Sequence, residues 1–232
     1  MSTRIAVIGA NGKVATCLIH QLSKLTDEFV TTAFIRNAQQ IPKFEQLGLF
    51  TSLEIDLTNS SVSDIARALK GFDAVVFSAG AAGKGLDLTL SVDLDGAVKV
   101  SEALQINGIK RFILVSALKS QEREFWWDTQ LRSYYIAKKY ADDIISSKLD
   151  IDWTILQPGM LEDTEGTGLI EDPTKVNDMA HKCAENGVLK ISRIDVASTI
   201  VECLQNPGTI HKFIPLINGG LQIKNAIKTI SF

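Results

Sequence analysis

Short runs of uncharged, apolar residues alternate along this chain with longer stretches in which apolar residues recur at helical spacing. The apolar runs predict strands over residues 5–8, 30–35, 53–55, 74–78, 112–116 and 153–156. The helical periodicity predicts helices over residues 14–25, 65–69, 88–106 and 134–149. Uncharged strands that alternate with helices are typical of a parallel sheet covered on both faces. The pattern therefore predicts a Rossmann-like, doubly wound α/β fold.

The pattern becomes less regular after Pro158. Residues 160–190 are rich in Glu, Asp, Thr, Gly and Asn, and within them a helix is predicted over residues 176–185. A helix, a strand and a helix are then predicted over residues 194–204, 212–217 and 221–230. No long repeat or flexible linker interrupts the chain. We expect one domain over residues 1–232, in which a Rossmann core (1–158) carries a small lobe (159–232) packed on it.

Composition and charge narrow the function classes. Lys and Arg number 24 against 27 Asp and Glu, a net charge of -3, so no positive field is available for a nucleic-acid partner. The longest uncharged stretches are far shorter than the roughly 20 apolar residues of a bilayer-spanning helix. The first strand pattern follows Met1 without a secretory leader, so we expect a cytoplasmic protein. No disulfide framework, zinc site or other metal site is expected from the three scattered cysteines: Cys17, Cys183 and Cys203.

The turn after the first predicted strand has the features of a dinucleotide-phosphate site. It reads Gly9-Ala10-Asn11-Gly12-Lys13-Val14-Ala15 and leads directly into a helix. The first glycine permits a tight turn, the second lets the backbone approach a diphosphate, and the alanine lets helix and strand pack closely. Backbone N–H groups and the positive end of the helix dipole would face the phosphates. Such turns also occur as simple connections, but this position in a βαβ pattern favours a coenzyme site.

The ends of the next strands predict the adenosine side of that site. Arg36 stands where an NAD-selective fold usually has a carboxylate, and its guanidinium suits the 2′-phosphate of NADP, with Lys13 as a second positive charge. We expect NADP(H) to be preferred and NAD(H) to remain possible; the alternative is that Arg36 merely ends a strand in solvent. Asp56 and Leu57 are predicted to contact adenine. The small residues Ser78-Ala79-Gly80 would let the coenzyme lie against the backbone.

Several motifs together resemble the short-chain dehydrogenase/reductase superfamily. The resemblance is strongest to its atypical NAD(P)-binding branch, described as epimerase/dehydratase-like or NmrA-like. The motifs, in order, are Gly9-x-x-Gly12-x-x-Ala15, Asp56-Leu57, Ser78-Ala79-Gly80, Tyr134-x-x-Ala137-Lys138, Thr154-Ile155-Leu156-Gln157-Pro158-Gly159 and Ser192-Arg193-Ile194-Asp195-Val196-Ala197. The resemblance implies that Pro158 and Gly159 line the nicotinamide pocket. It also implies that the segment with Arg193 starts a helix that packs the C-terminal lobe.

The resemblance implies catalysis by a tyrosine and a lysine four residues later, which share one face of a helix. The sequence offers Tyr134 with Lys138, and Tyr135 with Lys139. The first pair shares its side with apolar residues, whereas the second shares its side with Asp142 and is predicted to face water. The family motif also selects Tyr134 and Lys138, with Lys138 holding the nicotinamide ribose and lowering the pKa of the phenol. The alternative is that both tyrosine–lysine pairs lie on the surface of an ordinary helix and have no catalytic role.

The third catalytic group is a serine after the fifth strand, and here the match is incomplete. Ser116 lies one residue before the position at which the superfamily often has its hydroxyl, and Ala117 occupies that position. A missing donor would weaken stabilisation of a developing oxyanion by about 3 kcal/mol. Gln157 stands where related sequences frequently have arginine. Coenzyme binding and catalysis are therefore separate predictions.

The segment between Leu118 and Ser133 should lie over the nicotinamide. Trp126 and Trp127 form either a pocket wall or lid, or an anchor that fixes the loop to the fold. The three histidines have no common spacing and are predicted to be surface or packing residues: His20, His181 and His211.

The sequence favours an NADP-dependent oxidoreductase that transfers hydride between NADPH and a small carbonyl or quinone-like substrate. Ser116 would polarise the carbonyl, and Tyr134 would deliver or remove the proton. The alternative is a non-catalytic NADP(H)-binding redox sensor with a regulatory protein partner, and a homodimer is also possible. A sugar-nucleotide epimerase or dehydratase ranks lower, because the C-terminal lobe looks too short to hold a second nucleotide.

Overall fold

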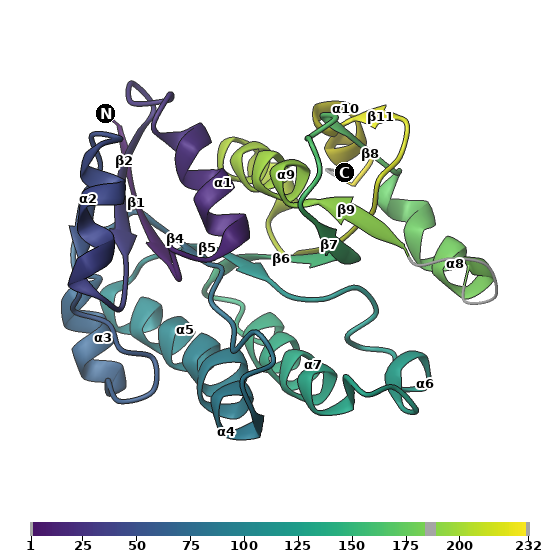
Figure 1. Ribbon diagram of the computed structural model, residues 1–232, viewed down its shortest axis with the longest axis horizontal. Coiled ribbons are helices and arrows are strands. Elements are labelled where there is room, and N and C mark those ends of the chain that lie inside the picture. Colours follow the sequence, from purple (N-terminus) through teal and green to yellow (C-terminus); the bar gives the residue numbers. More distant parts are fainter. Residues whose placement is uncertain (1, 184–188, 231–232) are drawn as a thin grey trace.

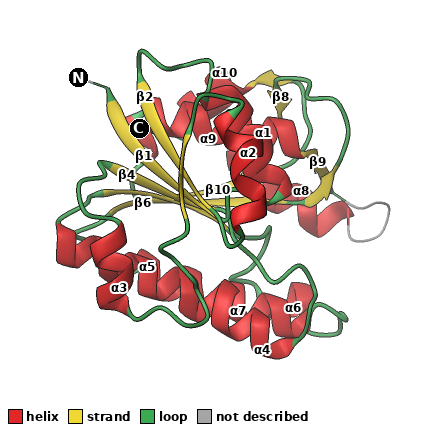
Figure 2. Ribbon diagram, turned by 60° about the vertical axis from the view of Figure 1, so that its left-hand side comes forward, coloured by secondary structure: helices red, strands yellow, loops and turns green. Residues whose placement is uncertain are grey.

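The computed structural model describes residues 2–183 and 189–230. Its centre is a seven-stranded sheet with the order β10-β6-β5-β4-β1-β2-β3, in which all neighbouring strands are parallel. The strands are β1 (Thr3–Ile8), β2 (Phe29–Phe34), β3 (Phe50–Ser52), β4 (Ala74–Phe77), β5 (Arg111–Val115), β6 (Asp152–Pro158) and β10 (Lys212–Leu216). The predicted Rossmann-like fold is confirmed, and the carboxyl ends of the strands meet at one edge of the sheet (Figures 1 and 2).

Helices cover both faces of the sheet because every central strand is apolar on both sides. In β1, Ile5 and Val7 pack into one core, and Ala6 and Ile8 pack into the other. The first core lies under α1 (Lys13–Leu22), α2 (Ile41–Glu45), α9 (Arg193–Gln205) and α10 (Ile223–Lys228). The second lies under α3 (Val62–Ala68), α5 (Asp95–Asn107) and α7 (Arg132–Ser146), below the sheet in Figure 1.

The third strand differs from its prediction. The strand predicted over residues 53–55 is wrong, since β3 comprises Phe50–Ser52. Its register pairs Ser52 with Phe34, the last residue of β2, so no neighbouring strand remains for residues 53–55. Leu53 is accordingly 46% exposed, although its apolar side chain suggested burial. The short helix α2 was not predicted.

The helix predicted over residues 88–106 is interrupted. It consists of α4 (Leu86–Leu88), a π-helical segment (Thr89–Leu94) and α5. A π-helical turn accommodates an extra residue and is often found at functional sites. In this protein the segment carries Asp93, which is buried although the surrounding periodicity is that of an amphipathic helix.

Residues after β6 contribute both to a small lobe and to the central sheet. In the lobe, β7 (Met160–Glu162) pairs with β9 (Lys190–Ser192), β8 (Leu169–Ile170) pairs with β11 (Leu221–Gln222), and α8 (Pro173–Cys183) lies alongside. Residues 221 and 222, predicted as the start of a helix, therefore form a strand, and the helix comprises Ile223–Lys228. In contrast, β10 and α9 complete the central sheet and one of its helical layers.

The cysteines and histidines of the described residues lie at separate places in the fold. Cys203 is buried and Cys17 is partly buried, and both are free thiols. His20 is exposed, whereas His211 packs its ring against Trp153 at 5.4 Å. The side chains of His181 and Cys183, and residue 185 at the end of a predicted helix, lie outside the described residues. None of the described helices is long and apolar enough to cross a membrane.

Candidate coenzyme site and active site

The turn between β1 and α1 requires glycine for a close backbone approach. Gly9 has a φ of 79°, and a Cβ at this position would lie 2.7 Å from the backbone of Ala79, which follows β4. The turn therefore brings the ends of β1 and β4 into contact. Gly12 is the N-cap of α1 and provides no side chain to cap the helix, so the first N–H groups of α1 are open to an anion. Val14, which was also predicted to bind the coenzyme, packs into the core and does not line the cavity at this end of the sheet.

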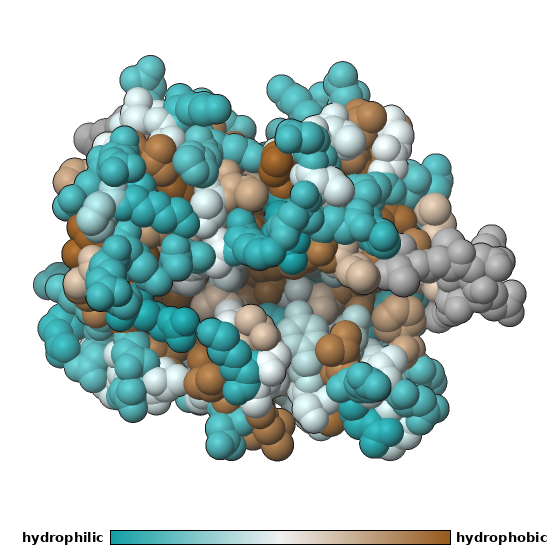
Figure 3. Space-filling model, viewed as in Figure 1, coloured by the Kyte–Doolittle hydropathy of each residue, from teal (hydrophilic) through white to brown (hydrophobic). Residues whose placement is uncertain are grey.

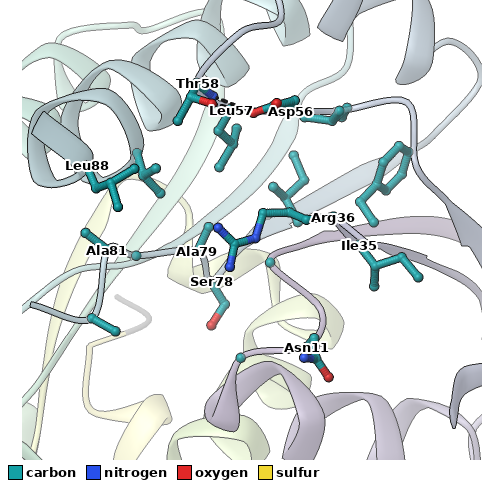
Figure 4. A pocket seen from close by; sticks show the side chains of 18 of the residues that line it. Asn11, Ile35, Arg36, Asp56, Leu57, Thr58, Ser78, Ala79, Ala81 and Leu88 are labelled. Atoms are coloured by element: carbon teal, nitrogen blue, oxygen red, sulfur yellow. Dashed lines mark hydrogen bonds between the residues drawn. The ribbon is translucent and has the colours of Figure 1, made fainter. Parts of the chain in front are cut away.

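A cavity of about 660 Å³ lies at this end of the sheet. Most residues predicted to bind the coenzyme line it: Gly9, Asn11, Gly12, Lys13, Arg36, Asp56, Leu57, Ser78, Ala79 and Gly80. They come from the ends of four strands, which the parallel topology places side by side (Figure 4). The volume is in the usual range for a cofactor site. Together with the glycine turn, this geometry fits a dinucleotide that lies across the strand ends.

The charges that line the first cavity favour an anionic ligand. Its lining residues include one acid, Asp56, and four cations, Lys13, Arg36, Lys84 and Arg193. Figure 4 shows the Arg36 guanidinium pointing into the cavity. The excess positive charge suits a phosphorylated ligand.

Asp56 has a local structural role that the sequence did not indicate. Its Oδ1 accepts hydrogen bonds from the N–H (3.0 Å) and Oγ1 (2.6 Å) of Thr58, and its Oδ2 accepts one from Nδ2 of Asn59 at 2.8 Å. These hydrogen bonds lower the pKa of Asp56 to about 2. The carboxylate thus fixes the turn after β3, beside Leu57 in the cavity wall.

A second cavity, of about 580 Å³, lies where β5 and β6 end. Its walls come from the β5 end, the α6–α7 region, β7 and α8, where α6 comprises Arg123–Trp126. Ser116, Tyr134, Pro158 and Gly159 line it, as the resemblance implied for a nicotinamide and substrate pocket. Arg193 lines both cavities and therefore marks the place where they meet.

Tyr134 and Lys138 are brought together on α7. The Lys138 ammonium lies 5.6 Å from the centroid of the Tyr134 ring and is almost completely buried. It also donates a hydrogen bond to the carbonyl oxygen of Val115 at 3.2 Å. The second candidate pair differs: Tyr135 stacks on Trp126, and the Lys139 ammonium lies 2.7 Å from a carboxylate oxygen of Asp143.

Burial controls the ionisation of the tyrosine and lysine. It raises the pKa of Tyr134 in spite of the opposing effect of Lys138, so the expected lowering of this pKa is not found. For Lys138, burial alone would lower the pKa, but the interactions with Tyr134, Asp93 and Asp142 outweigh it and raise the pKa. The pair is therefore a neutral phenol beside an ammonium.

Asp93 was not recognised from the sequence. Its Oδ1 lies 3.3 Å from the Lys138 ammonium, and its Oδ2 accepts a hydrogen bond from the backbone N–H of Ala81 at 2.8 Å. A Cβ at position 80 would lie 3.0 Å from Oδ1, so Gly80 permits this approach. Asp93 thus connects Lys138, which lines neither cavity itself, to the loop after β4, which lines the first.

The hydroxyl of Ser116 is directed at a buried carboxylate. Its Oγ donates to Oδ2 of Asp142 at 2.7 Å, and Ser120 and Gln121 donate to the same oxygen. The prediction that Asp142 faces water is wrong: it follows Lys138 by one helical turn, and the loop after β5 covers it. Burial raises its pKa against the effect of these donors. Because the Ser116 hydroxyl donates its hydrogen bond to Asp142, its oxygen can only accept a hydrogen bond from a substrate.

The two tryptophans have different roles. Trp126 is fully buried, its indole donates to the carbonyl oxygen of Ser120 at 3.1 Å, and its ring stacks on Tyr135 with a centroid distance of 5.8 Å. Trp127 is 47% exposed and lies under the Arg132 guanidinium. Neither is among the residues that line the second cavity, whereas Phe125 is. Trp126 is thus an anchor of the loop.

The fold and the glycine turn define a dinucleotide-binding α/β protein. A family model described as NAD(P)H-binding matches residues 9–207, and the chain belongs to this family. The chain is 46% identical to the UPF0659 protein YMR090W of Saccharomyces cerevisiae, over 98% of each chain.

Two solved structures share the fold over nearly the whole chain. One is a putative NAD-dependent epimerase/dehydratase from Bacillus halodurans, with 31% identity, a TM-score of 0.85, and coverage of 98% of this chain and 100% of that one. The other is the oxidoreductase ylbE from Lactococcus lactis, with 32% identity, a TM-score of 0.82, and coverage of 98% and 96%. The resemblance to atypical short-chain dehydrogenase/reductase-like NAD(P)-binding proteins is confirmed, whereas the NmrA-like assignment stays a prediction.

Proposed function

We propose that the protein is an NADP(H)-dependent oxidoreductase that reduces a small carbonyl or quinone-like compound in the second cavity. The observation that carries this proposal is the Tyr134 phenol at the wall of a cavity that adjoins the coenzyme cavity, with the buried Lys138 ammonium 5.6 Å from the centroid of its ring. A nicotinamide coenzyme supplies a hydride when it is bound. The residues of the chain then have to supply a proton to the substrate, and to stabilise the negative charge that remains on the group that gave up this proton.

Tyr134 is suited to donate that proton. Its raised pKa keeps the phenol protonated at neutral pH, and no described residue accepts a hydrogen bond from its hydroxyl. For a simple carbonyl, hydride and this proton give an alcohol; for a quinone, hydride and this proton give the hydroquinone monoanion, which takes its second proton from solvent. Lys138 stabilises the phenolate of Tyr134 until solvent reprotonates it. Since the Ser116 hydroxyl is occupied by Asp142, Tyr134 is the hydroxyl donor to the substrate.

NADPH oxidation with a panel of aldehydes, ketones and quinones tests this function. Tyr134→Phe should lower kcat/KM by about 100-fold or more, and the affinity for NADPH should be unchanged. Tyr140→Phe is the matched control, because Tyr140 lies on the same helix but is exposed to solvent. A wild-type protein that oxidises NADPH with no member of the panel contradicts the proposal.

A non-catalytic NADP(H) sensor is the second candidate. The occupied Ser116 hydroxyl favours it, together with Ala117 at the position where the superfamily often has its catalytic hydroxyl. Tight NADPH binding without turnover would support the sensor, and limited proteolysis with NADP⁺ and with NADPH would test whether the redox state changes the conformation.

Sugar-nucleotide epimerase or dehydratase activity ranks third, although the Bacillus halodurans neighbour is named a putative NAD-dependent epimerase/dehydratase. Much of the chain after β6 is used by α9 and β10, which complete the central sheet and its helical layer. This leaves a small lobe to enclose a second nucleotide. Turnover of a UDP-sugar without net NADPH oxidation would reverse this ranking.

A further inference from the structure

The second cavity is apolar apart from a few well-placed groups. Its walls include Leu118, Phe125, Leu161, Ala180 and Leu189. Two further apolar lining residues are strongly exposed at its rim, Leu131 (57%) and Met160 (52%). Figure 3 shows a groove that crosses this face of the molecule, with apolar side chains on its floor. Such a wall favours a ligand with an apolar, ring-sized body.

Arg193 is the only residue with a formal charge among the described residues that line this cavity. It begins α9, directly after the Ser192 N-cap, so the helix fixes the origin of the side chain. The side chain is 19% exposed. A guanidinium that is largely withdrawn from water and bordered by apolar groups is stabilised by an anion.

The partner of Arg193 within the chain does not balance the local charge. Nη1 of Arg193 donates to Oδ1 of Asp163 at 2.7 Å, and the Lys13 ammonium pairs with the other oxygen of the same carboxylate. Two cations thus share one anion, which leaves one net positive charge. A guanidinium has five N–H donors, and the described residues account for one of them at Arg193, so the group can bind a second carboxylate.

We propose that the second cavity binds a carbonyl compound with an apolar ring and one carboxylate, and that Arg193 binds this carboxylate. The inference rests on the proposed function for the carbonyl, which is placed at Tyr134. Since Tyr134 and Arg193 line the same cavity, one ligand can reach both. The competing ligand of Arg193 is the coenzyme diphosphate, because Arg193 also lines the first cavity. That cavity, however, already offers the N-terminus of α1, Lys13 and Lys84.

Binding to the full-length protein saturated with NADP⁺ tests the inference. Calorimetry with naphthoate and with naphthamide compares an acid with a neutral molecule of the same shape. Naphthoate should bind about tenfold more tightly or better, the size of a charge-assisted hydrogen bond, and Arg193→Gln should abolish the difference. Arg67→Gln is the control, because Arg67 lies on α3, pairs with an acid in the same way and lines neither cavity.

Two results would overturn the inference. The first is equal affinity of the two molecules for the wild-type protein, which is decisive even if the variant does not fold. The second is a preference for naphthoate that persists in Arg193→Gln. If the variant also loses affinity for NADPH in that second case, the guanidinium is assigned to the coenzyme diphosphate. Arg193→Lys keeps the charge and should retain part of the preference.

Turnover separates this inference from the proposed function. NADPH oxidation is measured with para-carboxybenzaldehyde and with its methyl ester. A preference for naphthoate together with reduction of neither aldehyde upholds the acid site and contradicts the reductase. Equal reduction of both aldehydes, with no preference for naphthoate, upholds the reductase and contradicts the acid site.

Discussion

The Lys138 ammonium lies 3.3 Å from Oδ1 of Asp93, and both side chains are buried. Lys138 belongs to α7, whereas Asp93 belongs to the π-helical segment before α5. The ion pair therefore fixes Lys138 to the element that also holds the loop after β4. A buried charge that loses its partner is costly, so this pair should matter for stability as well as for activity.

Asp93→Ala should lower the free energy of unfolding by about 3 kcal/mol, because it removes the carboxylate that pairs with the buried Lys138 ammonium. The matched control is Asp95→Ala, which removes a carboxylate that is largely exposed and pairs with Lys99; it should cost about 1 kcal/mol or less. Urea denaturation of both variants measures the difference. An equal loss in the free energy of unfolding for the two variants would show that the buried ion pair stabilises the protein no more than the exposed one.

Arg36→Ala should weaken binding of NADP(H) about 10- to 100-fold, the size of a lost hydrogen bond to a charged group. NAD(H) lacks the 2′-phosphate, so its affinity should change by less than about threefold. Fluorescence titration with NADPH and NADH gives both affinities, and Arg67→Ala serves as a remote control. Equal losses for the two coenzymes would remove Arg36 from the 2′-phosphate site.

Trp126→Ala should destabilise the protein by about 3–5 kcal/mol, because it leaves a large cavity and an unpaired carbonyl. Trp127→Ala, the adjacent control, should cost about 1 kcal/mol or less, since the side chain is half exposed. Thermal and urea unfolding measure these values. A change in KM with Trp127→Ala at unchanged stability would restore this residue as part of a substrate lid.

Asp56 should make stability depend on pH in the acid range. Its pKa is about 2, against an ordinary value of 3.8, so its contribution is present above pH 3.8 and is lost as pH falls toward 2. Because the side chain is exposed, solvent limits the effect to about 1 kcal/mol or less. Urea unfolding between pH 5 and pH 2 should therefore be less pH-dependent in Asp56→Asn. Carbon NMR of the carboxyl group measures the pKa itself, and a value near 3.8 would contradict the prediction.

The parts of the fold that could be predicted depend on local pattern. After their first one or two residues, β1, β4, β5 and β6 are uncharged, because both of their faces are buried there, and this property is visible in the sequence. β3 is a short edge strand, and its end is set by the end of β2 at Phe34, which the sequence of β3 does not record. The interruption of the predicted helix before α5 depends likewise on tertiary contacts, since Asp93 binds groups far from it in the chain.

The candidate site shows the same limit. The glycine turn could be predicted, because Gly9 meets a backbone requirement that few other residues meet. The burial of Asp142 could not be predicted, since its spacing along the helix does not reveal that the loop after β5 covers it. Trp126 and Trp127 are adjacent and chemically identical, yet the direction of the chain buries one and exposes the other. Arg193 was visible as a motif residue, but its position between two cavities arises from the packing of α9.

The outer strands of the sheet protect the protein from unwanted association. β10 is one edge, and the carbonyl oxygen of Leu216 accepts a hydrogen bond from Gly159, so the backbone of the preceding residue, Pro215, faces away from β6. Proline has no N–H to offer an approaching strand, and the opposite edge, β3, is only three residues long. A second chain that tried to extend the sheet would find few hydrogen-bonding partners at either side, which opposes aggregation through exposed strands.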